Sequence, residues 1–440
     1  MEFNKRLFFS LIALSIIIRV AFFLISHPIS FGMDSDLYRN LATQIAKMDL
    51  RNLTGEKPPL YPLFLLLCGL NNYAVWMVQS ILGILISVML YLITFQQSRS
   101  SLLSFIVGLL HSLNIDQLYF ESAIMTETLA TFFTLLSLFL LIYLLKKSTL
   151  KFFEVLVLGI IVSVAGLIRS NLLFLGILFF LILSFHLVKL RSSLLPGIKY
   201  LTVYLLPFLV IIGGWGSLMK LNSGHFTTTT MMGYNLCNSI GDIIEYASDD
   251  YQPLKDIYLK YRDQQKEAAS PREPIIFVLI PTMQKVTGLS YSDLSNRLVG
   301  LFLDVVSRHP LLYLKTVAAS WIKFWNIPRY DIKISAFESI FTKVYSLEIF
   351  FLVISNYLFF ILIGYYCLQI FTRNLILSFY DGLFALVVLG ASITSALFEY
   401  GNCRYSIPFM PLIIYFVCMN LHNVIRAKYS KYVQTAFNPA

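Results

Sequence analysis

The chain has 440 residues, of which 57% are hydrophobic and 15% aromatic, whereas charged residues make up only 13%. An ordinary soluble domain has roughly 25% charged residues, so this composition excludes a soluble enzyme and a disordered protein. The net charge of +10 comes from Lys and Arg residues scattered among apolar runs, which do not form the continuous basic surface of a nucleic-acid-binding protein. We therefore predict an integral membrane protein whose partners include membrane lipids and no nucleic acid.

Apolar runs long enough to cross a bilayer recur along the chain. The first follows the basic start MEFNKR, as in a signal peptide, but it is about 20 residues long and has no small-residue cleavage motif. We predict that it is a membrane helix, and that the protein is all-α and polytopic with about ten transmembrane helices. The predicted spans are Leu7–Ser26, Tyr73–Phe95, Leu102–Phe120, Leu129–Leu145, Phe152–Ile168, Leu172–Val188, Tyr200–Leu218, Leu347–Ile370, Leu375–Phe398 and Ile407–Leu421.

The basic residues between these runs predict the orientation. With the N-terminus in the cytoplasm, Lys and Arg fall at every inner connection, as the positive-inside rule requires. Both termini are then cytoplasmic. We expect an N-terminal transmembrane module (1–219) that includes the first outer loop (27–72), an outer segment (220–345), and C-terminal helices with a short tail (346–440). The inner basic residues are Lys5, Arg6, Arg99, Lys146, Lys147, Lys151, Lys189, Arg191, Lys199, Arg373, Arg426, Lys428 and Lys431.

The outer segment has a helical pattern near its end. From Asp293 to Trp325, apolar residues recur at helical spacing with charged residues between them, which predicts amphipathic helices. A spanning helix at Leu311–Trp325 is not expected, because this run is short and contains two lysines. We predict a small helical outer unit that returns to the membrane surface, with Trp321 and Trp325 as interfacial anchors.

The first outer loop contains two neighbouring carboxylates. Asp34 and Asp36 open an amphipathic run that ends at Ala46, and the stretch Glu56-Lys57-Pro58-Pro59-Leu60-Tyr61-Pro62 follows. In one interpretation an Asp caps the helix and Lys57 contacts lipid headgroups. In the other the loop holds a functional site, because a surface helix followed by a rigid Pro-Pro turn makes a poor flexible linker.

The pattern of these residues resembles a known family. Asp34-x-x-x-Tyr38-x-x-x-Ala42 followed by Lys57-Pro58-Pro59-Leu60-Tyr61-Pro62 is similar to the first outer loop of the C-type (GT-C) glycosyltransferase superfamily. The nearest branch is the bacterial relatives of protein O-mannosyltransferases and of the lipid A aminoarabinose transferase. Three later pieces fit the same pattern: Glu121-Ser122-x-x-Met125-Thr126-Glu127, Gly166-Leu167-Ile168-Arg169 and Arg404-Tyr405-x-x-Pro408-x-x-Pro411.

The resemblance implies a fold, a location and an activity. The fold would be the C-type architecture, with a periplasmic amphipathic helix in the first outer loop. The location would be a bacterial inner membrane with the active site on its periplasmic face. The activity would be inverting transfer of a sugar from a polyprenyl-phosphate donor to a lipid, glycan or protein acceptor.

The resemblance also implies roles for single residues. It makes Asp34 the catalytic carboxylate, and an Asp can take the proton of an attacking hydroxyl as a general base. A phosphate leaving group needs only positive charge to hold it. The donor-phosphate residues are expected to be Lys57, Arg169, Arg404 and Tyr405, and the donor or acceptor pocket residues Tyr38 and Tyr61.

The second acidic residue is left open. The family more often has an acidic residue at the position of Ser35, whereas this chain has Asp36. Asp36 is expected to bind an acceptor or a cation, or to cap the helix. Glu127 is the other candidate, and it either pairs with Lys57 or Arg404 or is simply an acid in the first turn of a helix, where the helix dipole favours it.

Other polar residues give weaker signals. We assign no cofactor and no metal, because the six His residues are scattered, although some C-type enzymes use a divalent cation. The cysteines have no metal-ligand spacing, and pairing of Cys237 with Cys403 is left open. Arg19 lies within the first span, where a charge is costly unless it is paired or functional.

Two further functions stay open beside the transferase. One is a transporter or flippase of a lipid-linked saccharide, although we find no inverted repeat of the kind many transporters have. The other is a surface-polysaccharide polymerase or ligase. No motif in the outer segment identifies the sugar or the acceptor.

Overall fold

The computed structural model describes residues 3–26, 34–48, 53, 55–190, 194–267, 275–334, 336–372 and 378–437. Within these ranges the chain is helical and forms no strand, which confirms the predicted all-α class. The helices are α1 (Lys5–Ser26), α2 (Ser35–Ala46), α3 (Leu60–Leu67), α4 (Asn72–Ser98), α5 (Ser101–Leu113), α6 (Ile115–Ser122), α7 (Glu127–Leu145), α8 (Phe152–Ile168), η1 (Ser170–Leu173), α9 (Phe174–Lys189), α10 (Leu194–Pro207), η2 (Phe208–Ile212), α11 (Gly213–Ser223), α12 (Met232–Ser239), η3 (Ile244–Tyr246), η4 (Asp249–Tyr251), α13 (Gln252–Glu267), α14 (Ile275–Thr287), α15 (Tyr291–Arg308), α16 (Pro310–Phe324), α17 (Glu338–Thr372), α18 (Phe379–Phe398), η5 (Cys403–Phe409) and α19 (Met410–Phe437).

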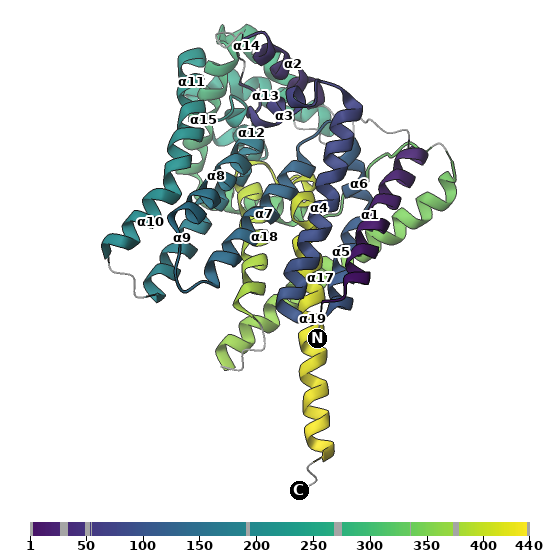
Figure 1. Cartoon of the computed structure of the whole chain (residues 1–440). Helices are drawn as coiled ribbons and strands as arrows, with labels where there is room; N and C mark the ends of the chain where they lie inside the picture. The colour runs from purple at the N-terminus through teal and green to yellow at the C-terminus, as the bar shows by residue number, and fades with distance from the viewer. Residues whose placement is uncertain are drawn as a thin grey trace.

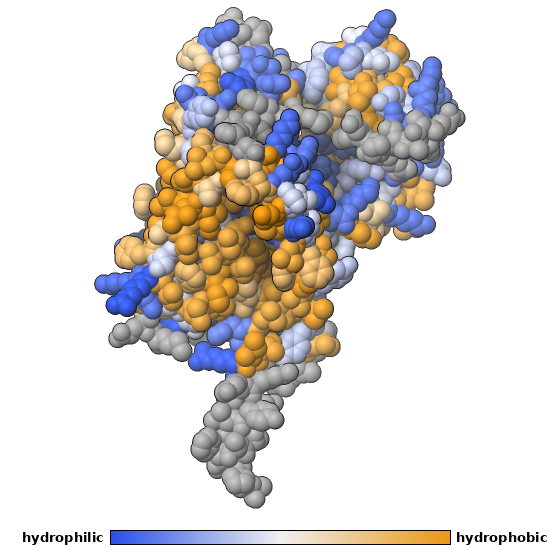
Figure 2. Space-filling model, turned by 90° about the vertical axis from the view of Figure 1, so that its right-hand side faces the viewer, coloured by the Kyte–Doolittle hydropathy of each residue, from blue (hydrophilic) through white to orange (hydrophobic). Residues whose placement is uncertain are grey.

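The protein is a polytopic membrane protein. Eight helical segments in the described ranges are long and apolar enough to cross a membrane, or nine if α5 and α6 form one bent span. The remaining predicted span, α8, is apolar but has 17 residues, the lower end of spanning length, so the count of about ten stays a prediction. Figure 2 shows a broad hydrophobic surface with hydrophilic residues above and below it, as expected for a bundle embedded in a bilayer.

The predicted span Leu102–Phe120 is not one straight helix. The chain breaks at Asn114 into α5 and α6, which are bent by 53° relative to each other. Asn114 has an extended backbone and its side-chain oxygen accepts the Gln117 N–H at 2.8 Å, so it caps α6. A hydropathy pattern detects the apolar run but not this amide cap, and the break turns the chain toward the start of α7.

Two other predicted spans differ in detail. The run Tyr200–Leu218 is interrupted by the π-helical turn η2, directly after Pro207, the last residue of α10. Proline has no backbone N–H and disturbs the regular helical ladder around it. The predicted span Leu375–Phe398 begins as α18 at Phe379, and residues 373–377 lie outside the described residues.

The predicted outer segment is helical and has its own apolar core. Leu294, Leu298, Leu301 and Val305 recur every three or four residues on α15 and are all buried, packing with α12, α13 and α14. Figure 1 shows α11, α13, α14 and α15 beside α2 at the upper end of the bundle, whereas α1 begins and α19 ends toward the lower end. The boundaries of this segment and the side of the membrane on which it lies stay predictions.

Helix α16 leads from the predicted outer segment back to the bundle. It has 15 residues, which is shorter than a typical membrane-spanning helix. Trp321 on α16 donates its ring N–H to Ser392 on α18 at 2.9 Å. The Trp321 and Trp325 rings also pack against Phe360 on α17. These contacts join α16 to two membrane helices, and the predicted role of the two Trp residues as interfacial anchors is left as a prediction.

The charge within the first span is paired. Arg19 donates to Glu121 on α6 at 2.7 Å, and both side chains are almost fully buried. A second donor nitrogen of Arg19 bonds the Ser15 carbonyl at 3.1 Å. Gly83 on α4 provides the space, because a Cβ at this position would lie 1.9 Å from the Glu121 carboxylate. Arg19 therefore has a structural partner that joins α1 to α6 across α4.

We expect Gly83→Ala to destabilise the protein, because the new methyl group pushes the buried Arg19–Glu121 pair apart. Overpacking of this kind costs about 1–3 kcal/mol of unfolding free energy. Gly364→Ala is the matched control, since a Cβ there meets nothing within 4 Å on helix α17. Thermal unfolding of the two purified variants in detergent tests this, and equal melting temperatures would contradict the described packing.

Candidate functional site

A polar pocket lies where five separate stretches of the chain meet at one end of the bundle. It contains about 490 Å³ of empty space, including its open mouth. The stretches are the start of α2, the turn before α3, the junction of α8 with η1, the segment leading into α12, and the turn from α18 into η5. The lining residues are Asp34, Tyr38, Glu56, Lys57, Pro58, Ile168, Arg169, Ser170, Asn171, Thr229, Met231, Asn235, Glu399, Arg404 and Tyr405.

Asp34 directly precedes α2 and its carboxylate binds two cations. Lys57 Nζ lies 2.8 Å from one oxygen and Arg404 Nη1 lies 3.0 Å from the other. The side chain makes no capping hydrogen bond to α2, so the capping interpretation is wrong for Asp34. Burial opposes its ionisation, but Lys57 and Arg404 outweigh burial and lower the pKa of this carboxyl from 3.8 to about 2. Asp34 is therefore ionised at neutral pH.

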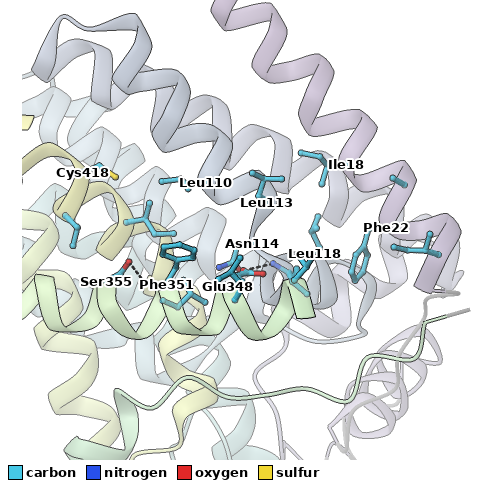
Figure 3. Close-up of a pocket in the computed structure, with 18 residues that line it drawn as sticks. Ile18, Phe22, Leu110, Leu113, Asn114, Leu118, Glu348, Phe351, Ser355 and Cys418 are labelled. Carbon is cyan, nitrogen blue, oxygen red and sulfur yellow. Dashed lines mark hydrogen bonds between the residues drawn. The ribbon is translucent and has the colours of Figure 1, made fainter. Parts of the chain in front are cut away.

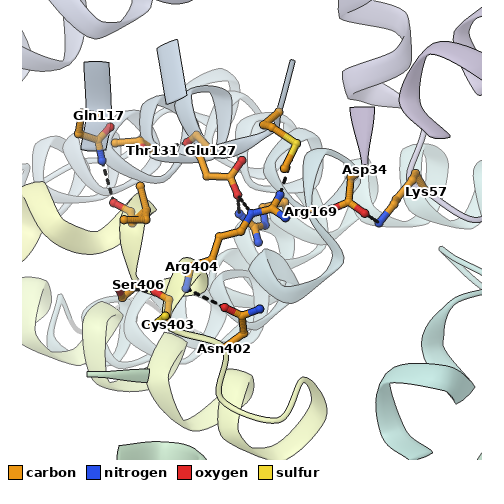
Figure 4. A network of polar contacts seen from close by, with 12 residues as sticks. Asp34, Lys57, Gln117, Glu127, Thr131, Arg169, Asn402, Cys403, Arg404 and Ser406 are labelled. Atoms are coloured by element: carbon orange, nitrogen blue, oxygen red, sulfur yellow. Dashed lines mark hydrogen bonds and ion pairs between the residues drawn. The ribbon is translucent and has the colours of Figure 1, made fainter. Parts of the chain in front are cut away.

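A second carboxylate, that of Glu127, binds both arginines (Figure 4). Glu127 is the first residue of α7 and is fully buried. One of its oxygens accepts hydrogen bonds from Arg404 Nε and from Arg169 Nη1, the latter at 3.1 Å. Arg404 therefore connects Glu127 to Asp34, and Arg169 stacks on the Tyr405 ring at 4.6 Å from its centroid.

Three cations and four carboxyl groups lie at the pocket, because Glu56 and Glu399 also line it. Three cations, Lys57, Arg169 and Arg404, meet two paired carboxylates, Asp34 and Glu127. Of the three cations, Lys57 and Arg404 contact Asp34, whereas Arg169 pairs with Glu127. An anion that enters the pocket therefore meets two cations whose only common partner is Asp34.

Gln79 on α4 holds two parts of the site together. Its side-chain oxygen accepts from the Tyr61 hydroxyl at 3.1 Å, and its nitrogen donates to the carbonyls of Glu121 and Ala123 at 2.9 Å each. Tyr61 follows the Pro-Pro turn and packs on Tyr38, with 4.9 Å between ring centroids. This buried amide therefore fixes the turn of the first loop relative to the segment that enters α7.

The first loop is also bound to the segment after α11. The Thr230 N–H donates to the Gly55 carbonyl at 2.8 Å, and the Thr229 hydroxyl donates to the Glu56 carbonyl at 2.6 Å. Gly55 has a φ of +60°, and a Cβ there would lie 2.0 Å from the end of Met219. A glycine is required for this close approach, which closes one wall of the pocket.

The structure brings most of the predicted site residues together. Asp36 is the exception, since it is exposed on α2 and does not line the pocket. Tyr61 is fully buried and supports Tyr38 from behind, and Glu127 binds the arginines from below the pocket floor. The predicted residues that line the pocket are Asp34, Tyr38, Lys57, Arg169, Arg404 and Tyr405.

Sequence reasoning missed the neutral residues of the pocket. Ser170 and Asn171 follow Arg169 directly and begin η1. Their closeness in sequence to a predicted site residue was the signal that could have identified them as pocket residues. Thr229 and Asn235 come from the outer segment, where no motif was found. Glu399 lies five residues before Arg404 at the turn after α18, so its closeness in sequence to a predicted site residue was the available signal.

A larger cleft lies between α1, α5, α17 and α19 (Figure 3). It contains about 1310 Å³ of empty space, including its open mouth, and its walls are mostly apolar. The Glu348 carboxylate lines it and accepts the Ile115 N–H at 2.9 Å. No Lys, Arg or His is among the described residues that line this cleft, so charged groups converge in the smaller polar pocket and we place the candidate site there.

In the part of the chain that the structure describes, no cluster of three or more His, Cys, Asp or Glu side chains is arranged to hold a metal ion. Cys237 is buried and Cys403 is partly buried, and both are free thiols. The pairing of these two cysteines, which was left open from the sequence, is therefore not formed.

No family model, curated protein or solved structure matches this chain. The likeness to C-type glycosyltransferases thus stands on the sequence motifs alone. The motif residues Asp34, Lys57, Arg169 and Arg404 come from distant parts of the chain and line one pocket.

We expect Glu127→Gln to destabilise the protein strongly, because two guanidinium groups lose their buried counter-charge. Removing one partner of a buried ion pair costs about 3–5 kcal/mol of unfolding free energy. Glu154→Gln is the control, since Glu154 pairs with Lys147 at the surface and surface pairs contribute little. Unfolding in mixed detergent micelles measures both variants, and a Glu127→Gln protein as stable as the control would contradict the described network.

Proposed function

We propose that the protein is an inverting glycosyltransferase that moves a sugar from a polyprenyl-phosphate donor to a hydroxyl acceptor at the membrane surface. The observation that supports this most is the Asp34 carboxylate, held between Lys57 and Arg404 at the mouth of the polar pocket. A base and two phosphate-binding cations within one contact shell are the groups that this reaction needs.

The cations would bind the leaving group. A phosphodiester-linked sugar already has a good leaving group, so positive charge near the phosphate oxygens is sufficient to stabilise the developing charge. Lys57 and Arg404 are the cations available, because each is partly exposed and Asp34 is the carboxylate that both of them contact. Glu127 keeps a second hold on Arg404, so the guanidinium stays in place when its contact with Asp34 is lost.

Donor binding would also activate the base. The pKa of Asp34 is low because two cations contact it. When the donor phosphate takes over these cations, the pKa of Asp34 rises and the carboxylate becomes a better proton acceptor. The acceptor hydroxyl then attacks the anomeric carbon, the bond from this carbon to the phosphate oxygen breaks, its electron pair stays on the phosphate, and the hydroxyl proton passes to Asp34.

We expect Asp34→Asn to abolish sugar transfer while donor binding becomes tighter, because the amide cannot take the proton and no longer competes for Lys57 and Arg404. Loss of a general base typically costs 10²- to 10⁴-fold in rate. Asp36→Asn is the control and should keep near wild-type activity, since Asp36 is exposed outside the pocket. Single-turnover transfer by purified protein from a polyprenyl-monophosphate sugar measures this. Full activity of both variants would overturn the proposed mechanism.

We expect Lys57→Gln to weaken donor binding, because it removes one of the two cations facing the phosphate. A charge-assisted hydrogen bond of about 1.5–3 kcal/mol corresponds to roughly ten- to a hundredfold in affinity. Lys47→Gln is the matched control, since Lys47 is exposed at the far end of α2. Equilibrium binding of a short-chain polyprenyl-phosphate sugar compares the two. An unchanged affinity in Lys57→Gln would return Lys57 to a role at lipid headgroups.

A further inference from the structure

The pocket also contains polar side chains that form no ion pair with its cations within the described residues. Five of them, which we call the polar wall, are Ser170, Asn171, Thr229, Asn235 and Glu399. Ser170 contacts Thr228 at 3.2 Å through its hydroxyl, so η1 and the segment before α12 form one continuous surface. This surface adjoins Arg169 in sequence and shares the pocket with Asp34.

Two atoms of the polar wall are buried without a partner. The side-chain oxygen of Asn171 and one carboxylate oxygen of Glu399 are inaccessible to solvent and accept no hydrogen bond from any residue that the structure describes. An unsatisfied buried polar atom costs about 1–3 kcal/mol. Such atoms also occur at other described residues, such as Glu121 and Asp381, so the position of these two beside the pocket carries the argument. Both atoms are acceptors and both belong to residues that line the same pocket, which points to a ligand rich in hydrogen-bond donors.

Glu399 differs from Asp34 in its electrostatics. It follows α18 and lies outside the membrane helices. Burial raises the pKa of Glu399 above its ordinary value, although Arg169, Lys57 and Arg404 oppose this shift. Glu399 is therefore a poorer partner than Asp34 for the cations that would bind a phosphate. Its carboxyl group is better suited to neutral hydroxyl groups, because it can accept hydrogen bonds from them and donate hydrogen bonds to them.

We infer that the polar wall binds the hydroxyl groups of the transferred sugar, with Asn171 and Glu399 as the discriminating contacts. This inference rests on the proposed function. The sugar is joined covalently to the phosphate, so when Lys57 and Arg404 hold the phosphate the sugar lies beside them, and the polar wall lines the same pocket. Among the described residues, the Asn171 side-chain oxygen and one Glu399 carboxylate oxygen are acceptors of this wall without a partner. A site built to bond substrate hydroxyls rejects analogues that lack them, because its own groups are left unpaired.

The test compares two lipids that differ only in the sugar. The probes are a short-chain polyprenyl monophosphate and the same lipid linked to whichever of glucose, mannose or galactose the wild type binds most tightly. Equilibrium binding is measured on the full-length protein in detergent for Asn171→Ala, Glu399→Ala and Glu399→Gln. Asn222→Ala is the control, since Asn222 lies at the end of α11 and its amide bonds only a helix carbonyl.

We expect Asn171→Ala to lose about two- to tenfold in affinity for the sugar-linked lipid, the value of one neutral hydrogen bond. Its affinity for the bare phosphate lipid and its thermal stability should match those of Asn222→Ala. Glu399→Ala should show the same selective loss, and Glu399→Gln should recover part of it because an acceptor oxygen is restored. Should Glu399→Ala fail to fold, Asn171→Ala and Glu399→Gln still decide the question.

Other outcomes would overturn the inference in distinct ways. Equal losses for both lipids would show that the polar wall acts on the phosphate or on the fold. Unchanged donor affinity with slower transfer would assign these residues to the acceptor. A wild-type protein that binds neither lipid would refute the proposed function itself, and the inference would fall with it.

Discussion

Everything at the site depends on how a fully buried carboxylate, Glu127, is neutralised. It sits at the first residue of α7 and binds two guanidinium groups through one oxygen. A buried charge without such partners would be too costly to keep. Arg404 also binds Asp34, so the buried Glu127–Arg404 pair fixes the position of the more exposed Arg404–Asp34 pair. The Asp34 end of the network is thereby built on a buried Glu127 that solvent does not reach.

Polar residues inside the apolar helices direct the chain to this anchor. Asn114 ends α5 and starts α6, and Gln79 holds the carbonyls that follow α6 while it binds Tyr61 of the first loop. The Arg19–Glu121 pair joins the same short helix to α1. In a bilayer such groups are costly unless they are satisfied. Gln79 and the Arg19–Glu121 pair bond partners on other elements, and Asn114 caps the helix that follows it, so these groups direct how the helices that support the site are arranged.

Hydropathy and charge patterns predicted the helical class and most spans, whereas the convergence of Asp34, Lys57 and Arg404 was implied only by the resemblance of their motifs to a known family. They did not predict the break at Asn114, because an average over an apolar run is insensitive to one amide cap. They also left Glu127 undecided, since its partners lie 42 and 277 residues away along the chain. The polar wall was missed because Ser, Asn and Thr are common in loops, and only their position beside the charged residues makes them notable.

The central claim is that Lys57 and Arg404 exchange Asp34 for a donor phosphate. The most direct measurement is a cryo-electron-microscopy structure of the Asp34→Asn protein with a short-chain polyprenyl-phosphate sugar bound. The account predicts phosphate oxygens at hydrogen-bond distance, about 3 Å, from Lys57 and Arg404, with the anomeric carbon facing residue 34. A headgroup bound elsewhere, for example in the apolar cleft beside Glu348, with the Lys57 and Arg404 side chains unliganded, would contradict it.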